Sequence, residues 1–129
     1  MTARRILWAD DEIELLRPHI LSLKERGYDV EAVTSGEDAM RAVPQSSFDA
    51  VLLDEQMGGL DGIATLQRIK KIREGLPVVM VTKSEEETTM EEAIGRRIDD
   101  YLTKPVNPSQ ILSVLKRLLE SRSISQERL

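Results

Sequence analysis

A chain of 129 residues with 40% hydrophobic and 32% charged residues is long enough to bury the core of one domain, and this balance excludes a disordered chain. It has no cysteine and one histidine, which excludes disulfides and thiolate zinc sites and nearly excludes a histidine metal site. No apolar run approaches the ~18 residues of a membrane span, and no signal peptide is recognisable, so we expect a cytoplasmic protein without a membrane partner.

The net charge of −5 is unevenly distributed along the chain. Residues 1–64 contain 13 acidic and 6 basic residues, whereas residues 65–129 contain 10 acidic and 12 basic residues. An acidic first half disfavours direct binding to nucleic acid, because contact with phosphates requires a basic face. It favours binding of a divalent cation instead.

Short apolar runs typical of buried strands alternate with helical patterns along the chain. The predicted strands are residues 6–9, 28–33, 49–54, 77–82 and 101–103. Apolar residues at helical spacing and capping residues predict a helix after each strand. The residues that cap the last four predicted helices are Ser35, Asp61, Ser84 and Asn107, the last followed by Pro108 at the first helical position.

Single residues refine the helix ends. Pro18 lies inside the first helix and is expected to weaken or bend its first turns, because it removes a backbone donor. Gly27 ends that helix, and Gly75 is predicted as the residue just past the third helix. Residues 121–129 have no stable apolar face, so we expect a domain of residues 1–120 followed by a tail or linker.

Five strands in strict alternation with five helices predict an α/β fold with a parallel sheet covered on both faces. Size and strand count favour the flavodoxin-like three-layer αβα sandwich, with strand order 2-1-3-4-5. Ligands bind such sheets between the first and third strands, where the strand order reverses. Asp10 and Asp11 follow the first strand and Asp54 ends the third, so this topology brings three carboxylates together.

The three carboxylates predict a cation site, because they cannot all stay ionised without one. A site with only oxygen ligands selects a hard ion, and Mg²⁺ fits best because it keeps positions open for water and phosphate oxygens. Thr82, at the end of the fourth strand, offers a hydroxyl, and Lys104, after the fifth strand, offers a positive charge. These groups together predict that Asp54 forms an aspartyl phosphate.

Each of these residues taken alone has a simpler explanation. Asp10 and Asp11 could cap the first helix and complement its dipole. Thr82 could be an ordinary strand-end hydroxyl, and Lys104 a solvated turn residue. His19 is interpreted as a helix-surface residue without a role. Only the whole set at the strand ends favours phosphoryl chemistry.

The chain resembles the receiver domains of bacterial response regulators (CheY-like domains) along residues 4–120. Four motifs in the order and spacing of that family make the resemblance highly specific, although each is weak alone. They are Ile6-Leu7-Trp8-Ala9-Asp10-Asp11-Glu12, Leu52-Leu53-Asp54 with Asp61-Gly62, Val79-Met80-Val81-Thr82, and Asp100-Tyr101-Leu102-Thr103-Lys104-Pro105.

The resemblance implies a receiver of a two-component phosphorelay. Asp54 would accept a phosphoryl group from a histidine kinase or a phosphotransfer protein in a Mg²⁺-dependent reaction. By the same match Asp11 would bind Mg²⁺ directly and Asp10 through water, with Asp54 as a further ligand. Gln56 would bind the metal through its main-chain carbonyl.

The resemblance also implies a switch rather than an enzyme acting on an external substrate, with only self-phosphorylation and autodephosphorylation activity. Thr82 and Tyr101 would form the switch pair, and Lys104 would bridge the phosphate and Asp54, with a cis bond to Pro105. The face formed by the fourth helix, the fifth strand and the fifth helix would control an output domain or a partner protein. A phosphorylation-dependent homodimer through that face is expected.

Two departures from the family pattern stand near the site. Glycine replaces the usual proline at Gly58, which is expected to loosen the loop after Asp54. Lys83 replaces a small residue, and we expect it to slow phosphoryl loss by shielding the group. The nearest resemblance is to receivers that precede a PglZ (alkaline-phosphatase-like) output domain, which would make this chain an excised N-terminal domain.

Two other function classes remain as alternatives. A Mg²⁺-dependent phosphohydrolase with an aspartate nucleophile would use similar groups, but it would need an acid/base carboxylate at the position of Gln56. A pseudo-receiver, acting as a constitutive interaction module, would not need the complete set of site residues.

Overall fold

The computed structural model describes residues 3–83 and 98–127. Five parallel strands form one sheet in the order β2-β1-β3-β4-β5, which confirms the predicted fold class and strand order. The strands are β1 (Arg4–Ala9), β2 (Tyr28–Val33), β3 (Ala50–Asp54), β4 (Val78–Thr82) and β5 (Asp100–Thr103). The α-helices of the described residues are α1 (Arg17–Glu25), α2 (Gly36–Ala42), α3 (Gly62–Ile72) and α5 (Pro108–Glu127). The predicted helix that begins at Ser84 lies outside the described residues.

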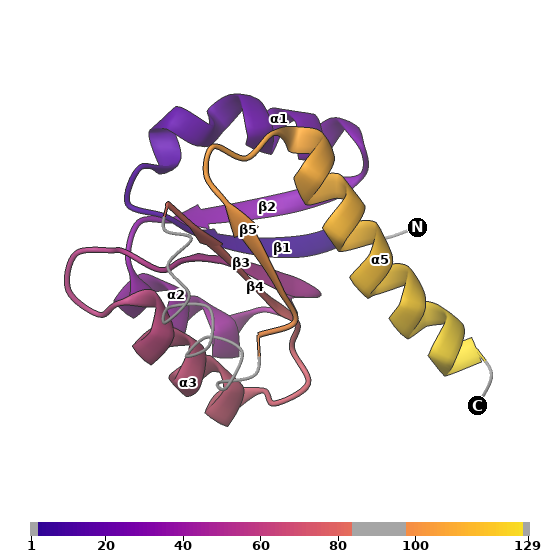
Figure 1. Cartoon of the computed structure of the whole chain (residues 1–129). Helices are drawn as coiled ribbons and strands as arrows, with labels where there is room; N and C mark the ends of the chain where they lie inside the picture. The colour runs from indigo at the N-terminus through magenta and orange to yellow at the C-terminus, as the bar shows by residue number, and fades with distance from the viewer. Residues whose placement is uncertain (1–2, 84–97, 128–129) are drawn as a thin grey trace.

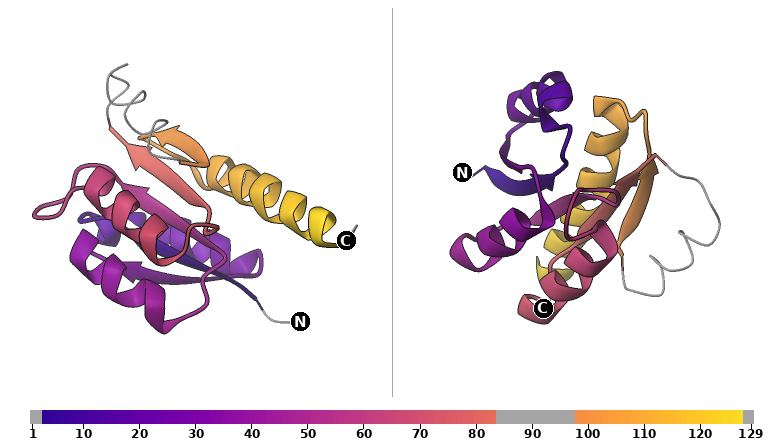
Figure 2. Two further views of the ribbon diagram at one scale, coloured as in Figure 1. Left: turned by 90° about the horizontal axis from the view of Figure 1, so that it is seen from below. Right: turned by 90° about the vertical axis from the view of Figure 1, so that its left-hand side faces the viewer.

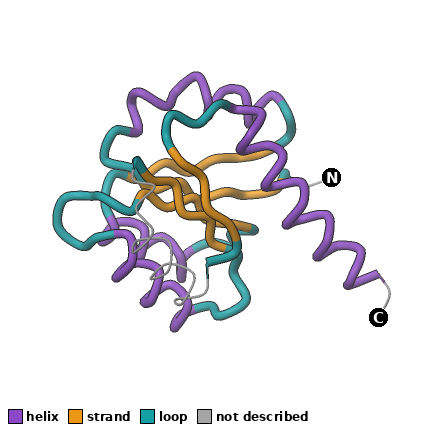
Figure 3. The backbone as a smooth tube through the Cα atoms, viewed as in Figure 1, coloured by secondary structure: helices purple, strands orange, loops and turns teal. Residues whose placement is uncertain are grey.

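The helices cover the two faces of the sheet. Figure 1 shows α1 and α5 on one side of the strands and α2 and α3 on the other. The same three layers are visible in two further views (Figure 2) and as a sheet enclosed by helices in the backbone tube (Figure 3). Burial on both faces explains why β3 and β4 are apolar along almost their whole length.

Alternate residues of each strand supply two separate cores. In β1, Leu7 and Ala9 pack into the core beneath α2 and α3, whereas Ile6 and Trp8 pack into the core beneath α1 and α5. Both cores are built mainly from aliphatic side chains, and Trp8 is completely buried. The period of two along a strand therefore decides to which side each strand-end residue belongs.

Several predicted turn and capping residues are confirmed. Ser35 accepts a hydrogen bond from the Asp38 amide (3.1 Å), and Asp61 accepts one from the Ala64 amide (2.8 Å). Asn107 accepts one from the Gln110 amide at 2.9 Å, so it caps α5. Each cap satisfies a backbone donor that the first turn of a helix leaves without a partner.

Gly27, with a φ of 92°, follows α1 as predicted. The helix before it begins differently: residues Ile13–Leu16 form a 3₁₀ turn, and α1 starts at Arg17 with Pro18 in its first turn. Proline is tolerated there because the amide it lacks would have no partner within the helix.

One predicted helix end is wrong. α3 ends at Ile72 with Arg73 as its C-cap, so Gly75 is not the residue just past the helix, and its φ is not positive. α5 continues to Glu127, beyond the last residue of its apolar pattern. A domain of residues 1–120 followed by a tail or linker of residues 121–129 stays a prediction, since a linker can itself be helical. A helix that is already formed can extend without an apolar face, because each further residue adds one hydrogen bond.

No helix in the described part of the chain is long and apolar enough to cross a membrane.

Gly62, the first residue of α3, packs against the backbone of the phosphoacceptor candidate. A Cβ atom at this position would lie 2.4 Å from the Asp54 carbonyl oxygen and 2.5 Å from the Glu55 Cα. The Gly62 amide also donates to the Glu55 carbonyl at 2.8 Å. The start of α3 and the end of β3 are therefore too close for any larger residue.

Gly62→Ala should lower the free energy of unfolding by about 1–3 kcal/mol, because two backbone segments must move apart. Gly75→Ala is the matched control: nothing lies within 4 Å of its added Cβ, and its φ is not in the left-handed region. We expect the control to be neutral or stabilised by up to about 1 kcal/mol. Urea unfolding measures both, and equal midpoints for the two variants would contradict the close contact.

Candidate functional site

The register of the sheet places the acidic residues at one level. Ala9 of β1 pairs with Leu53 of β3, so the next residues, Asp10 and Asp54, lie beside each other at the carboxyl ends of these strands. Trp8 and Leu52, two residues before Asp10 and Asp54, are buried in the core on the α1/α5 side of the sheet. The predicted meeting of the two strand ends is confirmed.

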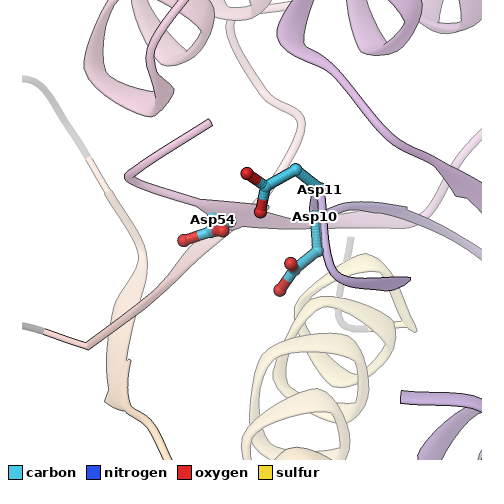
Figure 4. A group of neighbouring side chains, drawn as sticks. All are labelled: Asp10, Asp11 and Asp54. Atoms are coloured by element: carbon cyan, nitrogen blue, oxygen red, sulfur yellow. The ribbon is translucent and has the colours of Figure 1, made fainter. Parts of the chain in front are cut away.

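The three predicted carboxylates form one cluster. One oxygen from each of Asp10, Asp11 and Asp54 lies within 4.8 Å of the others. Figure 4 shows the three side chains gathered where β1 and β3 end. Asp10 is completely buried and Asp54 is 3% exposed, whereas Asp11 is exposed and keeps one side of the cluster open to solvent.

Backbone amides orient the two buried carboxylates. Asp10 Oδ1 accepts a hydrogen bond from the Glu12 amide at 2.8 Å, and Asp54 Oδ1 accepts one from the Gln56 amide at 3.2 Å. The alternative interpretation of Asp10 as a local cap is thus partly correct, since one of its oxygens holds the turn before the 3₁₀ segment. The second oxygen is left for the site.

Lys104 supplies the positive charge from the end of β5. Its Nζ lies 2.7 Å from Asp10 Oδ2 and 3.5 Å from Asp54 Oδ2. The lysine amide donates to the Thr82 carbonyl at 2.6 Å, and the Lys104-Pro105 bond is cis, as predicted. Lys104 therefore joins two of the three acidic residues and lies closer to Asp10 than to the phosphoacceptor candidate.

The pKa of Asp54 is raised to about 6. Burial is the main cause, and the negative charges of Asp10 and Asp11 act in the same direction. Lys104 and the Gln56 amide lower the pKa but do not offset these effects. The cluster thus has less positive charge than its carboxylates need.

The cluster has the chemistry of a site for a hard divalent cation. All three side chains offer oxygen ligands. Asp10 and Asp54 are buried away from water that would solvate their charges, whereas Asp11 is exposed on the open side. Mg²⁺ prefers such oxygen ligands and retains waters, so a partly open site suits it. Asp10, Asp11 and Asp54 are the residues that fit it here. The Gln56 amide donates to Asp54, and binding of the metal by the Gln56 carbonyl stays a prediction.

The predicted switch residues lie on the other face of the sheet. Thr82 is completely buried at the end of β4, and Tyr101 of β5 is half-buried against the α2/α3 core. Met80 pairs with Tyr101 and Thr82 with Thr103, so Thr82 and Tyr101 are diagonal neighbours on one face.

The prediction for His19 is wrong. The residue is half-buried, its Nε2 donates to the Val106 carbonyl at 2.6 Å, and its ring meets Trp8 edge to face with 6.4 Å between centroids. His19 thus links α1 to the segment before α5. Its partner is 87 residues away, and no local pattern of the sequence indicates the contact.

An ion pair beside the cluster is also absent from the predictions. Lys83 Nζ lies 2.5 Å from Glu12 Oε1, so the residue after β4 is joined to the residue after Asp11. The unusual lysine was noticed in the sequence, but its partner, 71 residues away, was not.

The chain is similar to known proteins along most of its length. Residues 6–116 match the family described as response regulator receiver domain. The transcriptional regulatory protein TcrA of Mycobacterium tuberculosis is 34% identical over 114 residues, covering 88% of this chain and 45% of TcrA. The transcriptional regulatory protein ZraR of Escherichia coli is 36% identical over 123 residues, covering 95% of this chain and 28% of ZraR.

The fold is also found among solved structures. The receiver domain protein of Methanospirillum hungatei has a TM-score of 0.90 and 26% identity, with 95% of this chain and 98% of that chain covered. This chain therefore spans the whole of a single receiver domain, but only half or less of the curated regulators TcrA and ZraR.

Asp54→Asn should stabilise the metal-free protein at pH 8 by about 2–3 kcal/mol, because one unit of pKa is about 1.4 kcal/mol and the folded state raises this pKa. Above pH 6 the wild type carries the full cost of the ionised buried carboxylate. As pH falls from 6 to 4 the folded state binds the proton first, so the difference should disappear.

Thermal or urea unfolding in EDTA between pH 4 and pH 8 measures this difference. Asp29→Asn is the control, because that carboxylate is 60% exposed in a surface ion pair and should change stability by less than about 0.5 kcal/mol. Adding Mg²⁺ should stabilise the wild type more than Asp54→Asn. A variant that is no more stable than wild type at pH 8 would show that Asp54 is not electrostatically destabilised.

Proposed function

The chain belongs to the response regulator receiver domain family and is a receiver of a two-component phosphorelay, and we propose that Asp54 is its phosphoacceptor. The observation that carries this assignment is the position of Asp54: a buried carboxylate at the end of β3, beside Asp10 and within reach of Lys104. Asp10 is the other buried carboxylate of the described cluster. It also contacts a backbone amide and Lys104 through separate oxygens, and it lies closer to Lys104 than Asp54 does.

The transfer step forms one bond and breaks one. An oxygen of the ionised Asp54 carboxylate attacks the phosphorus of the donor, the bond between phosphorus and the donor breaks, and the donor leaves with that electron pair. The product is an acyl phosphate on Asp54. Loss of the phosphoryl group is a separate hydrolysis. Water attacks phosphorus, the bond from phosphorus to the Asp54 oxygen breaks, and Asp54 keeps the electron pair as a carboxylate. Inorganic phosphate leaves with the oxygen of the water, and a proton of the water passes to solvent.

The chain's own residues position and neutralise these charges. Lys104 lies 3.5 Å from the Asp54 oxygen and would contact a phosphoryl group placed on it. Thr82 follows Val81, the register partner of Asp54, and would offer its hydroxyl to the same group. Mg²⁺ held by Asp10, Asp11, Asp54 and the Gln56 carbonyl would supply charge neutralisation for phosphate oxygens. Positioning and charge are the main catalytic factors in phosphoryl transfer.

The proposed output is a conformational switch. Phosphorylation adds negative charge at Asp54, draws Thr82 and Lys104 toward the new group, and shifts an equilibrium between two arrangements of the domain. Tyr101, the diagonal neighbour of Thr82, would transmit the change to the face formed by the predicted fourth helix, β5 and α5. This role needs no turnover of an external substrate.

The proposed partners follow from the family and from the chain's length relative to its relatives. A histidine kinase or phosphotransfer protein would be the donor, and the cytoplasm the compartment. TcrA and ZraR are named as transcriptional regulators and are longer than this chain, so contact with nucleic acid would come through an output domain. A PglZ-like output domain is our more specific proposal, based on the motifs around Trp8 and Lys83.

Acetyl phosphate with Mg²⁺ should add one phosphoryl group to the wild type and none to Asp54→Asn, because the variant lacks the nucleophile. Intact-mass analysis at pH 7–8 measures this gain, and EDTA should abolish it. The control is Asp61→Asn, which removes another carboxylate near the loop but lies at the cap of α3. It should still be phosphorylated.

The same experiment separates the other function classes. A wild type that gains no mass, although folded and supplied with Mg²⁺, would be a constitutive interaction module. Repeated turnover of a generic phosphoester such as p-nitrophenyl phosphate would favour a phosphohydrolase.

Beryllofluoride, which mimics a phosphoryl group, should convert the monomer to a dimer if the output face is the proposed one. All four residues of β5 are partly exposed at the edge of the sheet, which leaves this face available for a second copy. Multi-angle light scattering with and without beryllofluoride measures the mass. The same mass in both conditions would contradict the dimer.

A further inference from the structure

The Glu12–Lys83 ion pair lies beside the carboxylate cluster, at the ends of β1 and β4. Glu12 follows Asp11 after β1, and Lys83 follows Thr82 after β4, so the pair joins the two loops on either side of β3. Both side chains line a groove of about 370 Å³ that also contains Lys104 and His19. Two lysines therefore share one groove beside Asp54, and only one of them contacts the cluster directly.

Lys83 lies within the electrostatic range of the site. The pKa of Lys83 is raised chiefly by the hydrogen bond and charge of Glu12, and further by the negative charges of Asp54 and Asp11. Val81 pairs with Asp54, and Lys83 is two residues further along the chain, directly after β4. The long, flexible lysine side chain and its place in the same groove as Lys104 favour contact with a group attached to Asp54.

The charges of the site favour this exchange. The four carboxylates, including that of Glu12, face two lysines, so the metal-free site carries an excess of negative charge. A divalent cation offsets this excess. Conversion of the Asp54 carboxylate to an acyl phosphate then adds about one further negative charge and three strong acceptor oxygens. Lys104 is already bound between Asp10 and Asp54, which leaves Lys83 as the second positive charge of the groove.

The present partner of Lys83 holds it weakly. The Lys83 and Glu12 side chains are 60% and 41% exposed, and a solvent-exposed ion pair contributes little stability. A hydrogen bond to an ionised phosphoryl oxygen is stronger than a neutral one, and Lys is a common phosphate ligand. The lysine can therefore leave Glu12 at little cost.

We propose that Lys83 is a second phosphate-binding residue. In the unphosphorylated protein it is paired with Glu12, and after phosphorylation it leaves Glu12 and binds the phosphoryl group on Asp54. This inference rests on the proposed function of Asp54. Once bound, Lys83 covers phosphoryl oxygens and hinders the approach of water to phosphorus. Glu12 competes with the phosphoryl group for the lysine, so the Glu12–Lys83 ion pair sets how long the phosphoryl group is retained.

The test is the decay of the phosphorylated protein after acetyl phosphate is removed, followed by intact mass in Mg²⁺. Lys83→Ala should shorten the lifetime several-fold, and Lys83→Arg should restore it in part. Glu12→Gln should lengthen it by about twofold to fivefold, the range expected for loss of one exposed competing pair. The double variant should decay like Lys83→Ala, because Glu12 acts only through the lysine.

Glu14→Gln is the matched control. It removes the same charge two residues further on and also breaks an exposed ion pair, that with Arg17 at 2.6 Å. Its lifetime should equal that of the wild type. The affinity for beryllofluoride, measured by calorimetry, should follow the same order as the lifetimes, which a merely structural effect would not produce.

The outcomes separate the two proposals. If the wild type gains no phosphoryl group, the proposed function fails and this inference fails with it. If the wild type is phosphorylated but Lys83→Ala has an unchanged or longer lifetime, only the role of Lys83 is overturned. If Glu12→Gln still lengthens the lifetime in the Lys83→Ala background, Glu12 acts on the metal site directly, and the exchange is overturned.

Discussion

The candidate site depends on two buried carboxylates that lie side by side. Asp10 and Asp54 end neighbouring strands, neither is more than 3% exposed, and burial together with mutual repulsion raises the pKa of Asp54 to about 6. Lys104 and two backbone amides reduce this cost without removing it. A site with too little positive charge favours a bound cation, so the electrostatic cost of this arrangement supports the proposed Mg²⁺ binding and phosphoryl transfer.

The fold and the central site could be predicted because they follow from strong, repeated signals. Buried parallel strands are nearly continuous apolar runs, and alternation with helices leaves few topologies. Once the order β2-β1-β3-β4-β5 is accepted, the position of Asp10 beside Asp54 follows from the chain alone. Lys104 follows from the next strand ends in the same way. The prediction worked where function sits on the regular part of the fold.

The sequence does not predict contacts between single side chains that are far apart along the chain. It also predicts a helix end poorly where several residues could end the helix. His19 bonds to Val106 and Lys83 to Glu12 over more than 70 residues, and no periodic pattern encodes such contacts. Gly75 was assigned to a helix end that lies at Ile72, because several residues there could end the helix equally well. The sequence likewise does not indicate that α5 continues to Glu127, because residues 121–127 have no apolar face.

The loop after Asp54 contains two adjacent glycines, and its far end is held by a side chain of α2. Gly58 was expected to loosen this loop, yet the structure holds its far end: the Leu60 amide donates to Glu37 of α2 at 2.9 Å. Gly59 adopts a φ of 80°, and a Cβ there would lie 2.9 Å from the same carboxylate, so the glycine makes this approach feasible. Glu37 and Glu12 thus each join two distant segments near the site. Glu37 joins α2 to the loop after β3, and Glu12 joins the segment after β1 to Lys83 after β4. Segments next to the site are therefore held by carboxylates outside the cluster of Asp10, Asp11 and Asp54, and their contacts can be changed without altering the proposed phosphoacceptor.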